Sequence, residues 1–257
     1  MTSFSSIARH LDAVLRIADF PDYPNAVNGV QVDLDLDIVG IAAAVDIREK
    51  TILGCVEAGA NLLIVHHGLF WGGLQPLTGA HLRRVRALLE NGIALYSSHL
   101  PLDAHPELGN NVLLAQQMGV TPTRGFAREN GIDIGVMGET EIATEVLAMR
   151  ADAFAKLHGG AVRTSFTELG RQTRRWAICS GAGASSETIR EATELGVDTM
   201  IVGEGPHHTA IEAEESGIVV IYAGHYATET LGVQALARYA SQKFGIPWNF
   251  LHAPTGM

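Results

Sequence analysis

Apolar side chains near the N-terminus recur at helical spacing, at Ile7, Leu11, Val14, Leu15 and Ala18. This spacing predicts an amphipathic helix with Ser3 or Ser5 as its N-cap, ended by Pro21 and Pro24. Such a helix is stable when its apolar face covers other elements, and the segments that follow are strongly apolar.

Unbroken apolar runs then alternate with segments of helical pattern. They predict a strand at 38–45, a helix at 48–58, a strand at 62–65, a helix at 81–90 and a short strand at 93–98. Gly59 and Asn91-Gly92 end the two helices. This order is typical of βαβ units, whose parallel strands are buried between helices.

The second half of the chain repeats this order. Residues 185–205 align without gaps on residues 48–68, with matching apolar positions and with Gly196 over Gly59. The alternative explanation is that every βαβ unit needs such positions. We predict an α/β fold, a three-layer α/β/α arrangement within one domain of residues 1–257. It would comprise two pseudo-symmetric βαβ-containing lobes at about 1–120 and 121–257. Residues 121–175 would be connecting structure that starts the second lobe, with one helix between extended pieces.

The repeat also carries polar side chains. Aligning residues 91–99 on 216–225, with one inserted residue, places His99 over His225. A carboxylate follows each histidine four positions later, at Asp103 and Glu229. Packing requirements explain shared glycines more readily than a shared histidine and acid, so the repeat favours a functional site at the junction of the lobes.

The composition and charge of the chain limit the classes of molecule that it is expected to bind. The 257 residues are 47% hydrophobic and carry a formal charge of −10, which disfavours nucleic acid and anionic lipid but leaves room for an anion held by bound cations. No leader and no apolar run of roughly 18 residues is evident, so we expect a cytoplasmic protein without a membrane segment. Cys55 and Cys179 lie in apolar segments and are expected to be reduced and buried.

His66 and His67 end an apolar strand. Neighbouring strand residues point to opposite faces, so adjacent histidines would not normally converge on one ion, but at a strand end each could take its own cation. Hydrogen-bonded capping histidines are the alternative. His225 and Glu229 share a helical face at four-residue spacing, although helix capping also explains such pairs. Asp103 follows a strand, where we expect Pro101 to keep the backbone out of a helix.

Ligands collect at the carboxyl ends of strands in open α/β sheets. His66, His67, Asp103, His225 and Glu229 therefore predict a dinuclear metal site. His99, Glu204 and Asp46 are candidates for orienting an imidazole or moving a proton, and each of the three is also explained singly as a structural or solvated residue. The mixed nitrogen and oxygen ligands suit zinc, iron or manganese.

Several motifs resemble one family, the dinuclear-metal-centre, Ngg-interacting-factor-three-like proteins, also named GTP cyclohydrolase I type 2 homologues. The motifs are VNGVQV near 28–32, AAAVD up to Asp46, IVHHGLFWGG from Ile64, HLPLDAHPELGNN from His99 and GHYATET from Gly224. The resemblance implies two divalent ions per chain on the five ligands named above. It also implies a homohexameric ring, a trimer of dimers. Ile47 and Val30 depart from the commonest pattern.

The leading hypothesis is a metal-dependent hydrolase acting on a nucleotide or nucleotide-like small molecule, with GTP ring opening as one specific case. Asp103 or Glu229 would bridge the two cations, and the cations would activate a water. His99 or Glu204 would relay the proton. The alternative is a non-catalytic metal-binding scaffold or a protein-interaction and regulatory module. A third hypothesis is that no metal binds.

Overall fold

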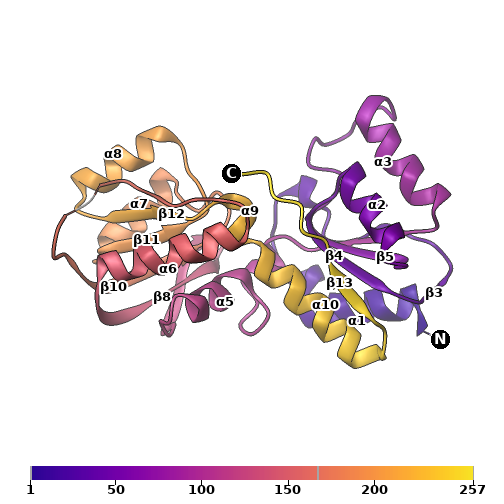
Figure 1. Cartoon of the computed structure of the whole chain (residues 1–257), viewed down its shortest axis with the longest axis horizontal. Helices are drawn as coiled ribbons and strands as arrows, with labels where there is room; N and C mark the ends of the chain where they lie inside the picture. Colours follow the sequence, from indigo (N-terminus) through magenta and orange to yellow (C-terminus); the bar gives the residue numbers. More distant parts are fainter. Residues whose placement is uncertain (1, 167, 257) are drawn as a thin grey trace. The chain divides into compact units, whose positions relative to one another are not determined.

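The computed structural model describes residues 2–166 and 168–256, and the chain divides into two compact units (Figure 1). The first unit contains Met1–Leu102 and Gly232–Ala253, and the second contains Asp103–Leu231 and Pro254–Met257. The predicted lobes were defined by the internal repeat rather than by packing, so the repeat boundaries at about 1–120 and 121–257 stay a prediction.

The first unit is built on a five-stranded sheet of order β13-β4-β5-β6-β2. Its strands are β2 (Gly29–Val32), β4 (Ile41–Asp46), β5 (Leu62–His67), β6 (Ala94–Ser97) and β13 (Trp248–Phe250). All neighbours are parallel except β2, which is antiparallel to β6. The carboxyl ends of β4, β5 and β6 therefore lie at one edge, where polar side chains can gather.

Helices cover both faces of this sheet (Figure 1). The crossover helices α2 (Glu49–Glu57) and α3 (Gly79–Glu90) lie on one face, and α1 (Phe4–Leu15) and α10 (Thr230–Phe244) lie on the other. Smaller elements are β1 (Thr2–Ser3), β3 (Asp37–Ile38), the 3₁₀ turns at Ile17–Asp19 and Pro24–Ala26, and α4 (Leu100–Asp103). Burial of Ala42, Ile52, Leu63 and Leu95 in one cluster fixes α2 on the sheet.

The second unit has a six-stranded sheet of order β7-β8-β10-β11-β12-β9. Its strands are β7 (Arg124–Glu129), β8 (Ile132–Ala143), β9 (Arg163–Thr164), β10 (Gln172–Cys179), β11 (Thr199–Val202) and β12 (Val219–Tyr222). The three central strands β10, β11 and β12 are parallel. The helices are α5 (Asn110–Gln117), α6 (Thr144–Leu157), α7 (Ser186–Glu194), α8 (His207–Glu215) and α9 (His225–Thr228). Two separate apolar clusters include Trp176 and Ala177, neighbours on β10 that face opposite sides.

The predicted α/β class is confirmed, with two sheets flanked by helices. Each unit contains the predicted strand–helix–strand–helix–strand order, as β4-α2-β5-α3-β6 and as β10-α7-β11-α8-β12. Gly59 and Gly196 both end a crossover helix with positive φ, at 65° and 68°. A side chain would strain that conformation, so these glycines were reliable helix-stop signals.

One local prediction was incomplete and another was wrong. Residues 121–175 contain one helix between extended pieces, as predicted, but they are more than connecting structure, because β7 and β8 form a hairpin that extends the second sheet. Its turn is Asn130-Gly131, both with positive φ, as a type I′ hairpin turn requires. Pro101 lies inside the one-turn helix α4. Proline is compatible with this position because N–H groups in the first turn of a helix have no partner within the helix, so the missing N–H costs no hydrogen bond.

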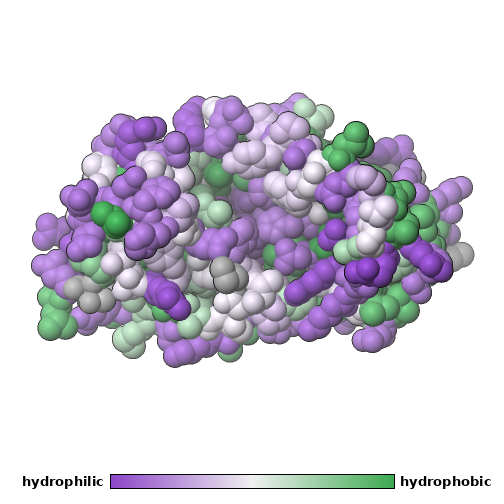
Figure 2. All heavy atoms as spheres, turned by 90° about the horizontal axis from the view of Figure 1, so that it is seen from above, coloured by the Kyte–Doolittle hydropathy of each residue, from purple (hydrophilic) through white to green (hydrophobic). Residues whose placement is uncertain are grey.

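No helix among the described residues is both long and apolar enough to cross a membrane. On the face that Figure 2 shows, hydrophilic side chains predominate and hydrophobic ones form small separate patches. Isolated exposed side chains such as Leu74 are normal on protein surfaces.

Candidate metal centre

Three histidines gather at the carboxyl edge of the first sheet. His66 and His67 are the last residues of β5, and His99 follows β6. One ring nitrogen of each lies within 4.8 Å of the corresponding nitrogens of the other two, a spacing that could hold a metal ion. The rings of His66 and His67 are 4.8 Å apart between centroids, so they converge more closely than strand alternation suggests, because the strand ends there.

Each of these imidazoles is held through Nδ1. His66 Nδ1 donates to the Ser98 carbonyl oxygen at 2.8 Å, and His67 Nδ1 donates to Asp46 Oδ1 at 2.9 Å. A carbonyl oxygen can only accept, so the proton of a neutral His66 ring lies on Nδ1, and Nε2 carries the lone pair that a metal would bind. Carboxylate or carbonyl acceptors behind the ring are characteristic of metal-ligating histidines. The residues of this group therefore fit a divalent ion.

His99 is held by a carboxylate that no sequence pattern indicated. Its Nδ1 lies 3.0 Å from Asp22 Oδ1, and Asp22 also accepts hydrogen bonds from Asn28 Nδ2 and the Leu100 N–H. Burial alone would raise the pKa of Asp22. The hydrogen bond and charge of His99, together with hydrogen bonds from Asn28 and the Tyr23 N–H, outweigh burial and lower this pKa. Asp22 therefore remains an acceptor that fixes the His99 ring.

In the second unit, His225 lies between two carboxylates. Its Nδ1 is 2.8 Å from Glu204 Oε1, and its Nε2 is 3.2 Å from Glu229 Oε2. The short helix α9 sets the His225–Glu229 pairing, as their four-residue spacing predicted. Glu204 thus holds the imidazole from behind, whereas Glu229, 3% exposed, faces the nitrogen that a metal would use.

Metal binding to the metal-free protein is expected to release a proton from His225. Burial favours the neutral ring, but the hydrogen bonds and charges of Glu229 and Glu204 outweigh burial and raise the pKa of His225 to about 9. A metal needs the unprotonated nitrogen, so affinity should rise about tenfold per pH unit and level off above that pKa. Calorimetric titrations near neutral pH, in buffers of different ionisation enthalpy, would count the proton. Buffer-independent heats would contradict this prediction.

Two glycines leave room for this pair. A Cβ at Gly181 would lie 2.2 Å from Glu229 Oε1, and one at Gly203 would lie 2.8 Å from the Cα of His225. Both residues follow the carboxyl ends of strands, β10 and β11. The backbone is therefore built closely around the His225–Glu229 pair, and larger residues at these positions would displace it.

Asp103 is the remaining carboxylate of the predicted ligand set. It is 6% exposed, and its Oδ1 accepts hydrogen bonds from Asn110 Nδ2 at 2.8 Å and Ser180 Oγ at 3.2 Å. Asn111 supports the same loop by accepting from the Ser180 N–H at 2.7 Å. These donors fix the Asp103 carboxylate in place, and its oxygens are ligands of the kind that zinc, iron and manganese accept.

The two cysteines are free and buried, as predicted. Burial raises the pKa of Cys55 to about 12. Burial and the charges of Asp103, Glu229 and Glu191 raise the pKa of Cys179 still further. Both thiols stay protonated, and a thiol must lose its proton to ligate a metal, so the candidate ligands are imidazoles and carboxylates.

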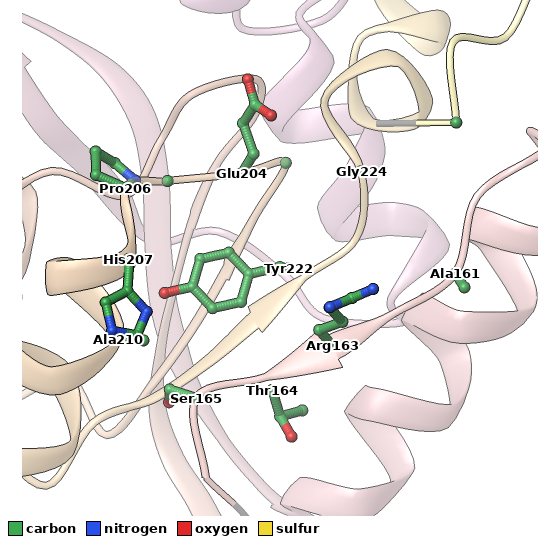
Figure 3. A pocket seen from close by; sticks show the side chains of 13 residues that line it. Ala161, Arg163, Thr164, Ser165, Glu204, Pro206, His207, Ala210, Tyr222 and Gly224 are labelled. Atoms are coloured by element: carbon green, nitrogen blue, oxygen red, sulfur yellow. The ribbon is translucent and has the colours of Figure 1, made fainter.

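A cavity of about 620 Å³ in the second unit opens beside Glu204 (Figure 3). Its wall includes Gly224, which precedes His225, and Tyr222 at the end of β12. Arg163 on β9 and His207 at the start of α8 line it as well. Arg163 and Tyr222 were not predicted as site residues, because neither belongs to a recognisable motif.

The structure therefore groups His66, His67 and His99 in the first unit and His225, Glu229 and Glu204 in the second. Asp46 and Glu204 each accept a hydrogen bond from a candidate ligand, at positions where an orienting acid was predicted. Ligation by the five predicted residues stays a prediction.

Comparison with known proteins identifies the family. The profile of the Duf34/NIF3 (NGG1p interacting factor 3) family matches residues 2–254. The chain belongs to the Duf34/NIF3 family. The GTP cyclohydrolase 1 type 2 homolog of Deinococcus radiodurans is 40% identical, covering 98% of this chain and 93% of that protein. The homolog from Pyrococcus abyssi is 42% identical, covering 98% of each.

Two solved structures agree with this chain in fold. TTHA1606 from Thermus thermophilus is 36% identical with a TM-score of 0.82, and all of both chains is covered. The protein ybgI is 32% identical with a TM-score of 0.89 over the same full coverage. The resemblance found in the sequence motifs is thus confirmed over residues 2–254.

Proposed function

We propose that this Duf34/NIF3 protein is a metal-dependent hydrolase that binds two divalent ions through His66, His67, Asp103, His225 and Glu229. The observation that carries the proposal is that His66, His67 and His225 each have Nδ1 fixed by a carbonyl or carboxylate oxygen. Nε2 is then the ring nitrogen that would ligate an ion. Zinc, iron and manganese all accept such nitrogen and oxygen ligands.

Two bound metal ions would supply an activated water and polarise the bond that is cleaved. The chain's own residues supply position and proton transfer. His99, fixed by Asp22, lies 5.0 Å from His66 between ring centroids and is a candidate to carry a proton. Glu204 orients His225, and with its side chain 39% exposed at the cavity it is the second candidate.

The substrate class that we propose is a nucleotide or nucleotide-like small molecule. The relatives from Deinococcus radiodurans and Pyrococcus abyssi are named GTP cyclohydrolase 1 type 2 homologs, and GTP ring opening is one specific case of the proposed chemistry. The cavity beside Glu204 falls in the size range of small-molecule sites, roughly 300–1,000 Å³.

Elemental analysis joined to an activity panel tests the proposal. Protein purified without chelator should carry about two ions per chain and hydrolyse at least one member of a nucleotide and phosphoester panel. His66→Ala should lower both metal content and turnover, whereas His208→Ala, an exposed histidine on α8, should change neither. Metal without turnover above the His66→Ala background would favour the scaffold alternative, and absence of metal would refute both.

Assembly and location belong to the same proposal. We infer a homohexameric ring, a trimer of dimers, from the family resemblance, and light scattering of the purified protein measures its mass directly. The free, buried cysteines suit a reducing compartment such as the cytoplasm.

A further inference from the structure

Arg163 stands out among the cations of the second unit. It is exposed at the wall of the cavity, and it forms no ion pair or side-chain hydrogen bond with any residue that the structure describes. The chain as a whole is acidic, with a net charge of −10, so its average field does not attract anions. A cation without a partner in a cavity supplies that attraction locally.

The strand register directs Arg163 to the same side as Tyr222. β9 pairs antiparallel with β12, and Arg163 lies directly opposite Tyr222, while Thr164 lies opposite the buried Ile221. Directly opposed residues share a face of a sheet and successive residues alternate. The guanidinium and the phenol ring therefore line one face of the sheet, and Figure 3 shows them on the same side of the β9–β12 pair.

The cavity has a basic and an acidic end. Arg163 and His207 flank Tyr222 in Figure 3, and the Glu204 carboxylate points away from them. His207, like Arg163, makes no ion pair or side-chain hydrogen bond within the described part of the chain. An anion would be attracted at the Arg163 end and repelled by Glu204, so the charges favour one orientation of an asymmetric ligand.

We propose that Arg163 binds the phosphate group of a small organic phosphate in this cavity. The phosphate lies at Arg163 and the organic part extends toward Glu204 and its hydrogen-bonded partner His225. Guanidinium groups bind phosphate through paired, charge-assisted hydrogen bonds, and the His207 ring adds a donor. This inference rests on the proposed hydrolase function, because it treats the Glu204–His225 end as the reacting end.

Calorimetric binding of GMP and of guanosine, which lacks the phosphate, tests the role of Arg163. The purified wild-type protein should bind GMP at least about tenfold more tightly than guanosine. Arg163→Gln should reduce this preference to about twofold or less. Arg190→Gln, which removes the same charge from the exposed face of α7 outside the cavity, should retain the preference.

Other outcomes overturn the inference. A full GMP preference in Arg163→Gln would mean that another group, such as a bound ion, holds the phosphate. No GMP binding, or equal binding of GMP and guanosine by the wild type, would also contradict it. Elemental analysis of the same samples reports separately on the metal-dependent function, since Arg163→Gln should keep the wild-type metal content whichever binding result is obtained.

Discussion

Glu229→Gln should reduce the metal content of the purified protein more than Glu204→Gln does. Both glutamates contact His225, but at different nitrogens, Glu229 at Nε2 and Glu204 at Nδ1. A glutamine at Glu204 can still accept the Nδ1 hydrogen bond, so we expect a loss of affinity within the roughly 10- to 100-fold range of residues that orient ligands. A glutamine at Glu229 removes a charged ligand and should cost more. Metal titration with a competing chelator would rank the two variants.

The matched control is Glu215→Gln, which removes one charge from the exposed end of α8 and should leave affinity unchanged. Glu229→Gln also removes the carboxylate that raises the pKa of His225 most. It should therefore lower the pKa of His225 and diminish the proton released on metal binding. Equal metal affinity in Glu229→Gln and wild type would remove Glu229 from the ligand set.

Local signals predicted the parts of the fold whose information lies in neighbouring residues. Glycine stops after α2 and α7 and apolar runs at β5 and β11 need only a short window of sequence, and both crossovers were located from them. The pairing of β13 with β4 joins segments from opposite ends of the chain. No local pattern specifies such a partner, so the return of α10 and β13 to the first unit could not be predicted.

The candidate site divides in the same way. His66, His67, His225 and Glu229 were predicted as ligands because adjacent histidines and the repeated histidine–acid spacing are visible in the sequence. Asp22 was missed because it meets His99 across 77 positions. The Asn130-Gly131 turn was a readable hairpin signal, and it would have placed β7 and β8 in the sheet.

Asp22→Asn should destabilise the first unit substantially. The Asp22 side chain is 4% exposed, and its two oxygens accept from His99 Nδ1, Asn28 Nδ2 and the Leu100 N–H. An asparagine replaces one acceptor oxygen by an NH2 group, which can only donate and therefore cannot pair with the N–H donors around it. With at least one of these buried donors left without an acceptor, the free energy of unfolding should fall by about 1–3 kcal/mol. Urea unfolding curves measure this difference.

Asp35→Asn provides the comparison, because Asp35 is exposed and the same change of charge there should shift the free energy of unfolding by less than about 0.5 kcal/mol. The Asp22 effect should persist when the protein is stripped of metal by chelator, since the hydrogen bonds to Asn28 and Leu100 do not involve an ion. If Asp22→Asn unfolded at the wild-type urea concentration, Asp22 would not be what fixes His99, and the imidazole would have to be oriented by its ring neighbours His66 and Trp71.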